Sequence, residues 1–239
     1  MALKIMKFLS VRRGTICIVL PIFLLISSSF QPASLKRYAL KRVVIDAGHG
    51  GHDSGCLGAN AKEKDIALAV ALKLGKAIEE NFPDVKVVYT RKTDVFVELH
   101  ERANIANNAK ADLFICIHCN SACYYNKKAK KLKCNEESNG TETWVMGLHK
   151  SDENLEVAKR ENEVVLMEKD YQKQYDGFDP NSAEANIIFS LYQNTYLDQS
   201  LHLASLVQSE MKKTGRDTRG VKQAGFIVLY KTYMPSILI

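Results

Sequence analysis

VVIDAGHGGHD, at residues 43–53, is the stretch that decides the fold of this chain. Strand-compatible residues at 43–46 run directly into a glycine-rich turn that carries two histidines, His49 and His52. A buried strand followed by such a turn delivers polar side chains to the edge of a sheet, where α/β proteins place their functional groups. A histidine in a glycine-rich loop is often only a turn residue, so a functional assignment needs partners elsewhere in the chain.

The composition indicates one globular domain. The chain has 239 residues, of which 46% are hydrophobic, which is enough for one sizeable core. The formal net charge is +6, but four of the 33 Lys and Arg residues and none of the 27 acidic residues lie within residues 1–33. The rest of the chain is therefore nearly neutral, and we expect no nucleic-acid partner.

Residues 1–33 have the layout of a secretory signal peptide. Basic residues come first, a short apolar run follows at 14–26, and three serines come next. The run is short for a membrane span, so we exclude this segment from the fold. We expect a protein that is secreted to the periplasm or cell envelope. The alternative is an uncleaved signal that anchors the chain in the membrane.

Five cysteines lie beyond the signal segment, and an odd number leaves at least one without a partner in the chain. Cys123 and Cys134 bracket a lysine-rich segment, and an exported protein meets an oxidising compartment wherever the host maintains one. We expect these two residues to close a loop through a disulfide; the alternative is that both stay unpaired.

The order of periodic segments predicts an α/β fold. Apolar residues recur every four positions in the segment 63–80, as in an amphipathic helix that lies on a sheet: Ile66, Val70, Leu74 and Ile78, with Ala67 and Ala71 beside them. Strand patterns at 85–90 and 112–118 alternate with this helix and with a second one at 97–108. We therefore expect a catalytic domain at 41–239 built on a single twisted, largely parallel sheet with helices on both faces.

His118 ends the nearly all-apolar strand at 112–118 and supplies the partner that His49 needs. Both histidines follow apolar strands, so both emerge at the C-terminal edge of one sheet. Two histidines and a carboxylate can form a three-ligand zinc site with one position open for water. We favour Glu63 as the carboxylate because it opens the helix that follows the His49 loop. On spacing alone, a role as a helix-start residue is equally compatible.

Two alternatives to this ligand set stay open. The opening stretch contains three substitutes for the favoured ligands: Asp46, His52 and Asp53. The cysteines at 116, 119 and 123 also suggest a structural zinc site, but strand alternation directs Cys119 away from Cys116 and His118. A His/Glu site is therefore the leading prediction.

Several motifs follow one another in an order that is found in a known family. Residues 46–51 match a strand that ends in Asp-Pro/Ala-Gly-His-Gly-Gly, Glu63 matches a glutamate that opens the first helix, and residues 116–121 match Ser-Ile-His-Ala-Asn-Ala with substitutions. Segments 90–94, 102–107 and 220–229 match further signatures. On these motifs the chain resembles the zinc-dependent N-acetylmuramoyl-L-alanine amidases of the amidase-3 type, from about residue 41 to the end.

The resemblance implies a ligand set and a reaction. It implies that His49, Glu63 and His118 bind Zn²⁺, and that the substrate is peptidoglycan. The bond cleaved is the amide between the lactyl group of N-acetylmuramic acid and L-alanine of the stem peptide. In such a reaction zinc would polarise the carbonyl and lower the pKa of its bound water, and a carboxylate would take that proton and later pass it to the leaving nitrogen.

The general base is where this sequence departs from the family pattern. In the family, the motif that resembles residues 234–239 is followed directly by the catalytic glutamate, and this chain stops at Ile239. The catalytic residue is therefore unknown here, and we expect a chain truncated at its C-terminal end, which binds zinc but hydrolyses poorly. The alternative is a catalytically silent peptidoglycan-binding or regulatory module that lacks the base.

A long insertion, at about 122–213, separates His118 from the late motif. Alternation predicts a strand at 141–147, and apolar spacing predicts a charged helix at 152–171 and a longer helix at 186–213.

The first helix of the insertion resembles the inserted segment of cell-separation amidases. In those enzymes a carboxylate takes the open zinc position until a protein activator displaces the helix. On this resemblance Glu161 is the candidate autoinhibitory residue, with Glu163 and Glu168 as alternatives. The competing interpretation is a surface helix whose charges are solvated.

Overall fold

The computed structural model describes residues 39–58, 60–126, 130–134, 137–191 and 195–239. The signal segment predicted at 1–33 lies outside these ranges. Within the described ranges, no helix has both the length and the apolar composition that a membrane span requires.

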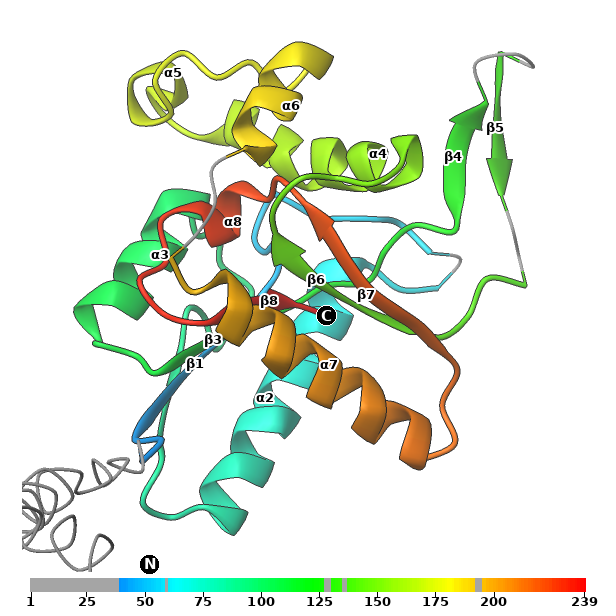
Figure 1. The fold of residues 1–239 in the computed structure, drawn as a ribbon. Helices are drawn as coiled ribbons and strands as arrows, with labels where there is room; N and C mark the ends of the chain where they lie inside the picture. The colour runs from blue at the N-terminus through cyan, green and yellow to red at the C-terminus, as the bar shows by residue number, and fades with distance from the viewer. Residues whose placement is uncertain (1–38, 59, 127–129, 135–136, 192–194) are drawn as a thin grey trace, which may run out of the picture. The chain divides into compact units, whose positions relative to one another are not determined.

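A six-stranded mixed sheet forms the centre of the domain, in the order β2-β1-β3-β8-β6-β7 (Figure 1). The strands are β1 (Arg42–Ala47), β2 (Lys86–Tyr89), β3 (Leu113–Ile117), β6 (Thr141–Met146), β7 (Thr218–Ala224) and β8 (Ser236–Leu238). The first four in this order run parallel, β6 pairs antiparallel with β8, and β7 runs parallel to β6. The predicted largely parallel α/β sheet is confirmed.

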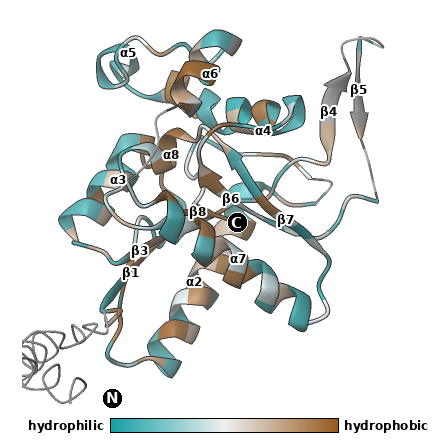
Figure 2. Cartoon of the chain, in the orientation of Figure 1, coloured by the Kyte–Doolittle hydropathy of each residue, from teal (hydrophilic) through white to brown (hydrophobic). Residues whose placement is uncertain are grey.

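Helices cover both faces of the sheet, as predicted. On one face, α2 (Glu63–Asn81) and α7 (Leu197–Lys213) pack against the side of the sheet that carries Val43, Ile45 and Ile237. On the other, α3 (Leu99–Asn108), α4 (Asp152–Asn162) and α8 (Ile227–Tyr230) enclose a core that includes Phe114 and Trp144. Hydrophobic residues concentrate on the central strands between these two layers (Figure 2).

The buried stripe of α2 differs from the one expected from its large apolar residues. Ile66 and Val70 are 40% and 43% exposed, whereas Ala67, Ala71 and Gly75 face the sheet. A Cβ atom at Gly75 would lie 1.8 Å from the hydroxyl of Tyr89 on β2. Leu74 and Ile78 pack against the same core, so the predicted stripe is right for these two residues and for Ala67 and Ala71, and wrong for Ile66 and Val70.

The segment between β3 and β7 is only partly an insertion. β6 and α7 belong to the main sheet and its helical layer, although both fall within the predicted insertion at 122–213. Outside the sheet lie the hairpin β4 (Cys123–Asn126) and β5 (Lys131–Cys134), and the helices α4, η1 (Glu163–Met167), α5 (Tyr171–Gln174) and α6 (Ala183–Ser190). A disulfide joins Cys123 to Cys134, which confirms the predicted pairing.

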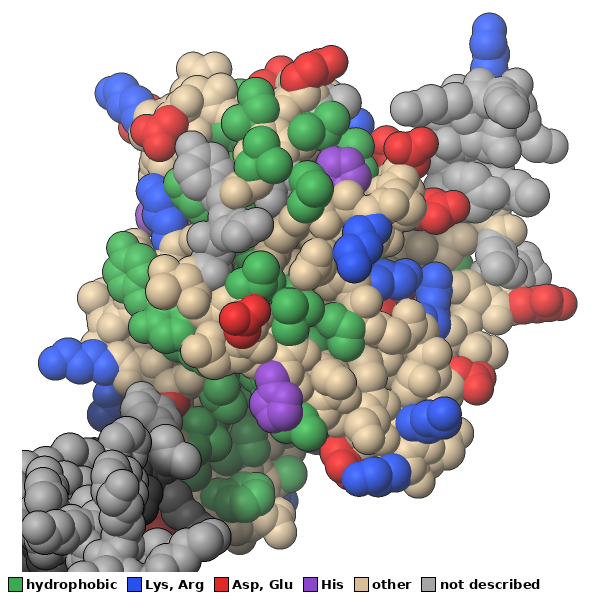
Figure 3. Space-filling view, in the orientation of Figure 1, with side chains coloured by type: hydrophobic (Ala, Val, Ile, Leu, Met, Phe, Trp, Pro, Cys, Tyr) green, Lys and Arg blue, Asp and Glu red, His purple; other side chains and the backbone are tan. Residues whose placement is uncertain are grey.

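Both long helices predicted in this segment are shorter than expected. The charged helix ends as an α-helix at Asn162 and continues as the 3-10 turn η1, which buries the consecutive residues Val164 and Val165. A surface helix buries residues three or four positions apart on one face, so two adjacent buried residues do not fit this pattern. The helix predicted at 186–213 is two helices, α6 and α7. Ile188 of α6 and the residue that caps it, Leu191, are exposed, and Figure 3 shows hydrophobic side chains gathered over this helix.

Candidate metal centre

The loop after β1 has a backbone conformation that arginines hold in place. His49 has a left-handed backbone, with φ of 59°, which is unusual for a residue other than glycine. Arg102 donates from Nη1 to the carbonyl oxygen of Ala47 at 2.8 Å and from Nη2 to that of His49 at 3.0 Å. Arg91 donates from Nη2 to the carbonyl oxygen of Gly48 at 2.8 Å. The carbonyl groups of the loop are therefore anchored, and the imidazole of His49 points in one direction.

Asp46, on β1, anchors this network and takes no part in the metal centre. Its buried carboxylate accepts hydrogen bonds from Arg102 Nη1 at 2.9 Å, Thr90 Oγ1 at 2.6 Å and the thiol of Cys116 at 2.8 Å. Burial raises the pKa of Asp46, but Arg102 and these hydrogen bonds outweigh burial and lower it. The carboxylate therefore stays ionised as the counter-ion of Arg102.

Two glycines allow the histidines and Glu63 to approach one another. A Cβ atom at Gly48 would lie 2.5 Å from Nε2 of His118. At Gly55, where φ is 62°, a Cβ atom would lie 2.5 Å from Cδ2 of His49 and 2.8 Å from Glu63. Glycine at these two positions is therefore a steric requirement of the site.

Four side chains converge at the C-terminal edge of β1 and β3: His49, Glu63, His118 and Glu161. Glu63 Oε1 lies 3.2 Å from His49 Nε2 and 3.0 Å from His118 Nδ1. Glu161 Oε2 lies 3.3 Å and 2.9 Å from the same two nitrogens. The structure thus brings together the three predicted metal ligands and the predicted autoinhibitory residue.

The surroundings fix the orientation of His49 and Glu63. Nδ1 of His49 is 2.8 Å from Oδ2 of Asp53, which leaves Nε2 directed at the other three groups. The carboxylate of Glu63 accepts hydrogen bonds from the backbone N–H groups of Cys56 at 2.8 Å and Cys119 at 2.7 Å. A carboxylate behind a histidine and hydrogen bonds to a carboxylate ligand are the usual supports of metal ligands in proteins.

The charges of the four groups balance one another. Burial lowers the pKa of His49, but hydrogen bonds with Asp53, Glu161 and Glu63 outweigh burial and raise the pKa to about 10. Burial raises the pKa of Glu161, but His118 and then His49 lower it to about 2. Imidazolium and carboxylate groups therefore neutralise each other at the positions from which they can bind a cation.

The donor atoms fit a divalent metal ion. Nε2 of His49 and both carboxylate oxygens of Glu161 are buried without a hydrogen-bond partner of good geometry, which is costly unless a ligand satisfies them. Ligand atoms about 2.0–2.2 Å from a tetrahedral zinc ion lie roughly 3.3–3.6 Å apart. The four separations of 2.9–3.3 Å come close to that geometry. Two imidazoles with carboxylate oxygen are also a donor set that suits zinc.

The other candidate residues lie elsewhere. His52 is exposed and stacks on Phe96 with ring centroids 4.2 Å apart, and Asp53 supports His49 from behind. Glu163 is exposed. Glu168 accepts a hydrogen bond from the backbone N–H of Leu99 at the start of α3, so it is not at the metal centre.

A cysteine-ligated zinc finds no support in the described residues. The thiol of Cys116 is buried and donates to Asp46. Burial and the nearby charge of Asp46 raise the pKa of Cys116 to about 12, so the thiol stays protonated. Cys123 forms the disulfide with Cys134.

The supporting roles of Arg91 and Arg102 were not assigned from the sequence. A basic residue that follows a strand or lies within a helix gives no sign that it will bind the carbonyl groups of a loop.

Comparison with known proteins identifies the family of this chain. The model of the family described as N-acetylmuramoyl-L-alanine amidase matches residues 43–239. The chain belongs to this family. The N-acetylmuramoyl-L-alanine amidase AmiA of Escherichia coli (strain K12) is 30% identical over 214 residues, which cover 87% of this chain and 68% of that protein. A putative N-acetylmuramoyl-L-alanine amidase of Buchnera aphidicola is 31% identical over 82% of this chain and 79% of its own.

A solved structure agrees with this assignment. The crystal structure of the N-acetylmuramoyl-L-alanine amidase from Clostridium difficile 630 has a TM-score of 0.52 and 26% sequence identity, and the match covers 83% of this chain and 77% of that one. The family consists of hydrolases that act on peptidoglycan, so peptidoglycan amidase is the activity of this chain's family, and the catalytically silent alternative is not favoured.

Replacement of Asp53 tests the support of His49. We expect Asp53→Ala to weaken metal binding about 10–100-fold, because the imidazole loses the carboxylate that orients it. Competition with a chromophoric chelator measures the affinity. His52→Ala is the matched control, since this histidine lies in the same loop and stacks on Phe96 outside the site. Equal affinities of the Asp53 variant and the unaltered chain would contradict the proposed support.

Proposed function

We propose that the chain is a zinc-dependent amidase whose zinc ligands are His49, Glu63 and His118, and that it cleaves the bond between the lactyl group of N-acetylmuramic acid and L-alanine. The observation that carries this proposal is the convergence of buried donor atoms without satisfactory partners at one edge of the sheet. A bound zinc ion would polarise the carbonyl group of the substrate and lower the pKa of a water molecule bound to it. The protein contributes fixed ligand orientation through Asp53 and the backbone at Cys56 and Cys119.

Metal analysis tests the ligand set directly. We expect one zinc per chain after dialysis, and loss of that zinc in His49→Ala, Glu63→Ala and His118→Ala, because each substitution removes one of three ligands. His149→Ala is a control for histidine loss outside the centre. Retention of a full equivalent of zinc by any of the three ligand variants would exclude that residue as a ligand.

The general base is proposed at the position after Ile239. The backbone N–H of His118 donates to the carbonyl oxygen of Ile239 at 2.9 Å, and that of Ile239 donates to Cys116 at 2.9 Å. The carboxyl end of β8 therefore lies beside the histidine at the end of β3. A glutamate joined to Ile239, as the family pattern has it, starts from this edge of the sheet and is within reach of a metal-bound water.

Extension of the chain tests this assignment. We compare residues 1–239 with a form that continues with the family's glutamate and closing segment, and with the same form carrying Gln at that position. We expect hydrolysis of muropeptide to be about 10²–10⁴-fold faster in the glutamate form than in either of the others. Equal turnover by all three forms would show that the base lies elsewhere.

Autoinhibition by α4 is the second part of the proposal. The carboxylate of Glu161 lies against the same two nitrogens as Glu63, where it would occupy the position that a metal-bound water needs. We propose that a protein activator displaces this helix at the cell envelope during cell separation, and that residues 1–33 direct export. The exposed apolar side chains of α6 support contact with a partner.

Substitution of Glu161 tests autoinhibition. In the extended form, we expect Glu161→Gln to raise basal hydrolysis by about tenfold or more, because the neutral amide competes less well with water for the metal. Glu163→Gln, an exposed glutamate two residues on, should leave the rate unchanged. No increase with Glu161→Gln would leave α4 as an ordinary surface helix.

A further inference from the structure

The residue after Glu161 attaches α4 to the sheet. We infer that Asn162 is the positioning residue of the autoinhibitory contact: its amide fastens the end of α4 to the β7–α8 junction (residues 225–227) and thereby holds Glu161 over the metal centre. This inference rests on the proposed role of Glu161. It also gives a role to the late motif at 220–229, which supplies no ligand of the metal centre: Gly225 and Ile227 of this motif hold the amide of Asn162.

The amide of Asn162 makes hydrogen bonds of good length in a buried setting. Asn162 is 1% exposed. Its Nδ2 donates to the carbonyl oxygen of Gly225 at 2.7 Å, and its Oδ1 accepts from the backbone N–H of Ile227 at 2.9 Å. A carbonyl only accepts and an N–H only donates, so these partners fix which way the amide faces. The side chain thus pairs with the junction as a neighbouring strand would.

The β7–α8 junction is a rigid support for this pairing. Phe226, between the two bonded residues, is fully buried and packs edge-on against Trp144 of β6, with ring centroids 5.5 Å apart. α8 packs against α3 in the same core. An anchor on this junction therefore fixes the last turn of α4 relative to the sheet that carries the histidines.

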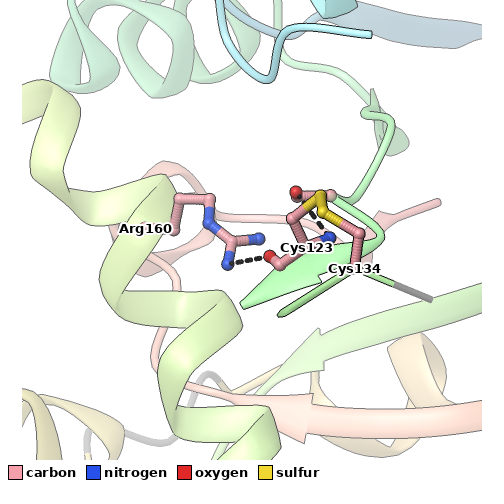
Figure 4. Close-up of a disulfide and its surroundings, with 4 residues drawn as sticks. Cys123, Cys134 and Arg160 are labelled. Carbon is pink, nitrogen blue, oxygen red and sulfur yellow. Dashed lines mark hydrogen bonds between the residues drawn. A yellow bond between two sulfur atoms is a disulfide. The ribbon is translucent and has the colours of Figure 1, made fainter. Parts of the chain in front are cut away.

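The autoinhibitory contact requires such an anchor. Glu161 is buried, its Oε1 has no hydrogen-bond partner, and its carboxylate lies in the same cluster as a second carboxylate, that of Glu63. The two histidines attract this carboxylate, but a buried oxygen without a partner favours solvent, so the position of the helix turn decides whether the contact persists. On the other side of the turn, Arg160 Nη2 donates to the carbonyl oxygen of Cys123 at 3.3 Å (Figure 4). That contact reaches the β4–β5 hairpin, which lies outside the sheet. Ala158, Val164 and Val165 pack in the core beside the sheet, and Asn162 adds directional hydrogen bonds to it at the residue next to Glu161.

Asn186 provides a matched control. It is also 1% exposed and lies in the same segment, where its Nδ2 donates to the carbonyl oxygens of Pro180 and Ser182. Its Oδ1 accepts from Asn162 at 3.2 Å. Asn186→Ala therefore removes a buried amide of the α4–α6 segment and leaves both bonds to the β7–α8 junction intact.

Access to the metal measures the position of Glu161 without reliance on turnover. The full chain is loaded with Co²⁺ and titrated with acetohydroxamate, a small bidentate metal ligand, and the cobalt absorption bands report binding. We expect Asn162→Ala to bind acetohydroxamate about tenfold more tightly than the unaltered chain, since loss of both bonds shifts the population toward a displaced helix. Asn162→Asp keeps only the acceptor for Ile227 and should shift affinity in the same direction, which provides a second test if the alanine variant does not fold.

The remaining variants separate the two levels of the proposal. Glu161→Gln should also tighten binding, and Glu161→Gln with Asn162→Ala should bind no more tightly than Glu161→Gln alone. If Glu161→Gln has no effect, the proposed autoinhibition fails. If it tightens binding while both Asn162 variants do not, autoinhibition stands and the positioning role of Asn162 is wrong. An equal effect of Asn186→Ala would also overturn that role, because it would indicate general loosening of the segment.

Discussion

The buried ion pair between Asp46 and Arg102 is the interaction on which the site depends. Removal of two charges from water is costly, and the cost is offset here because each group also makes several hydrogen bonds to other partners. Arg102 reaches Asp46, the carbonyl oxygens of Ala47 and His49, and that of Val97 at the start of α3. One guanidinium therefore ties the end of β1, the histidine loop and the neighbouring helix together. Its rigid planar fork suits this task better than the single ammonium of lysine.

The metal centre and the autoinhibitory contact use the same atoms. His49 and His118 present nitrogens to Glu63 on one side and to Glu161 on the other. The carboxylate of Glu161 already lies where a metal ligand would lie, so it could bind a metal ion without any movement of the two histidines. In the proposed autoinhibition, regulation depends on where one helix turn lies, and we propose that the contacts of Asn162 help to fix that position.

Much of the fold was predictable because its signals are local. The strands at β1, β2 and β3 and the helices α2 and α3 follow from short apolar periods, and the order of these elements restricts the sheet to a largely parallel arrangement. Predictions were wrong where long-range packing decides. α2 buries Ala67 and Ala71 and leaves Ile66 and Val70 exposed, and Tyr89 occupies the space that a side chain at Gly75 would need. The predicted helix at 152–171 ends at Asn162 because the core takes up Val164 and Val165 together.

The sequence by itself determined the chemical types at the site: a histidine after each of two apolar strands and a glutamate at the first turn of α2, in an order typical of the amidase family. The parallel direction of β1 and β3 brings the two histidines to one edge, and the helix that follows the His49 loop starts there with Glu63. Glu161 was a candidate only on the family resemblance, and the tertiary structure places it at the centre; the tertiary structure alone decided that Asp53 orients a histidine and that Asp46 serves Arg102. Those relations depend on side-chain directions set by packing between segments far apart in the chain, which no local pattern of residues encodes.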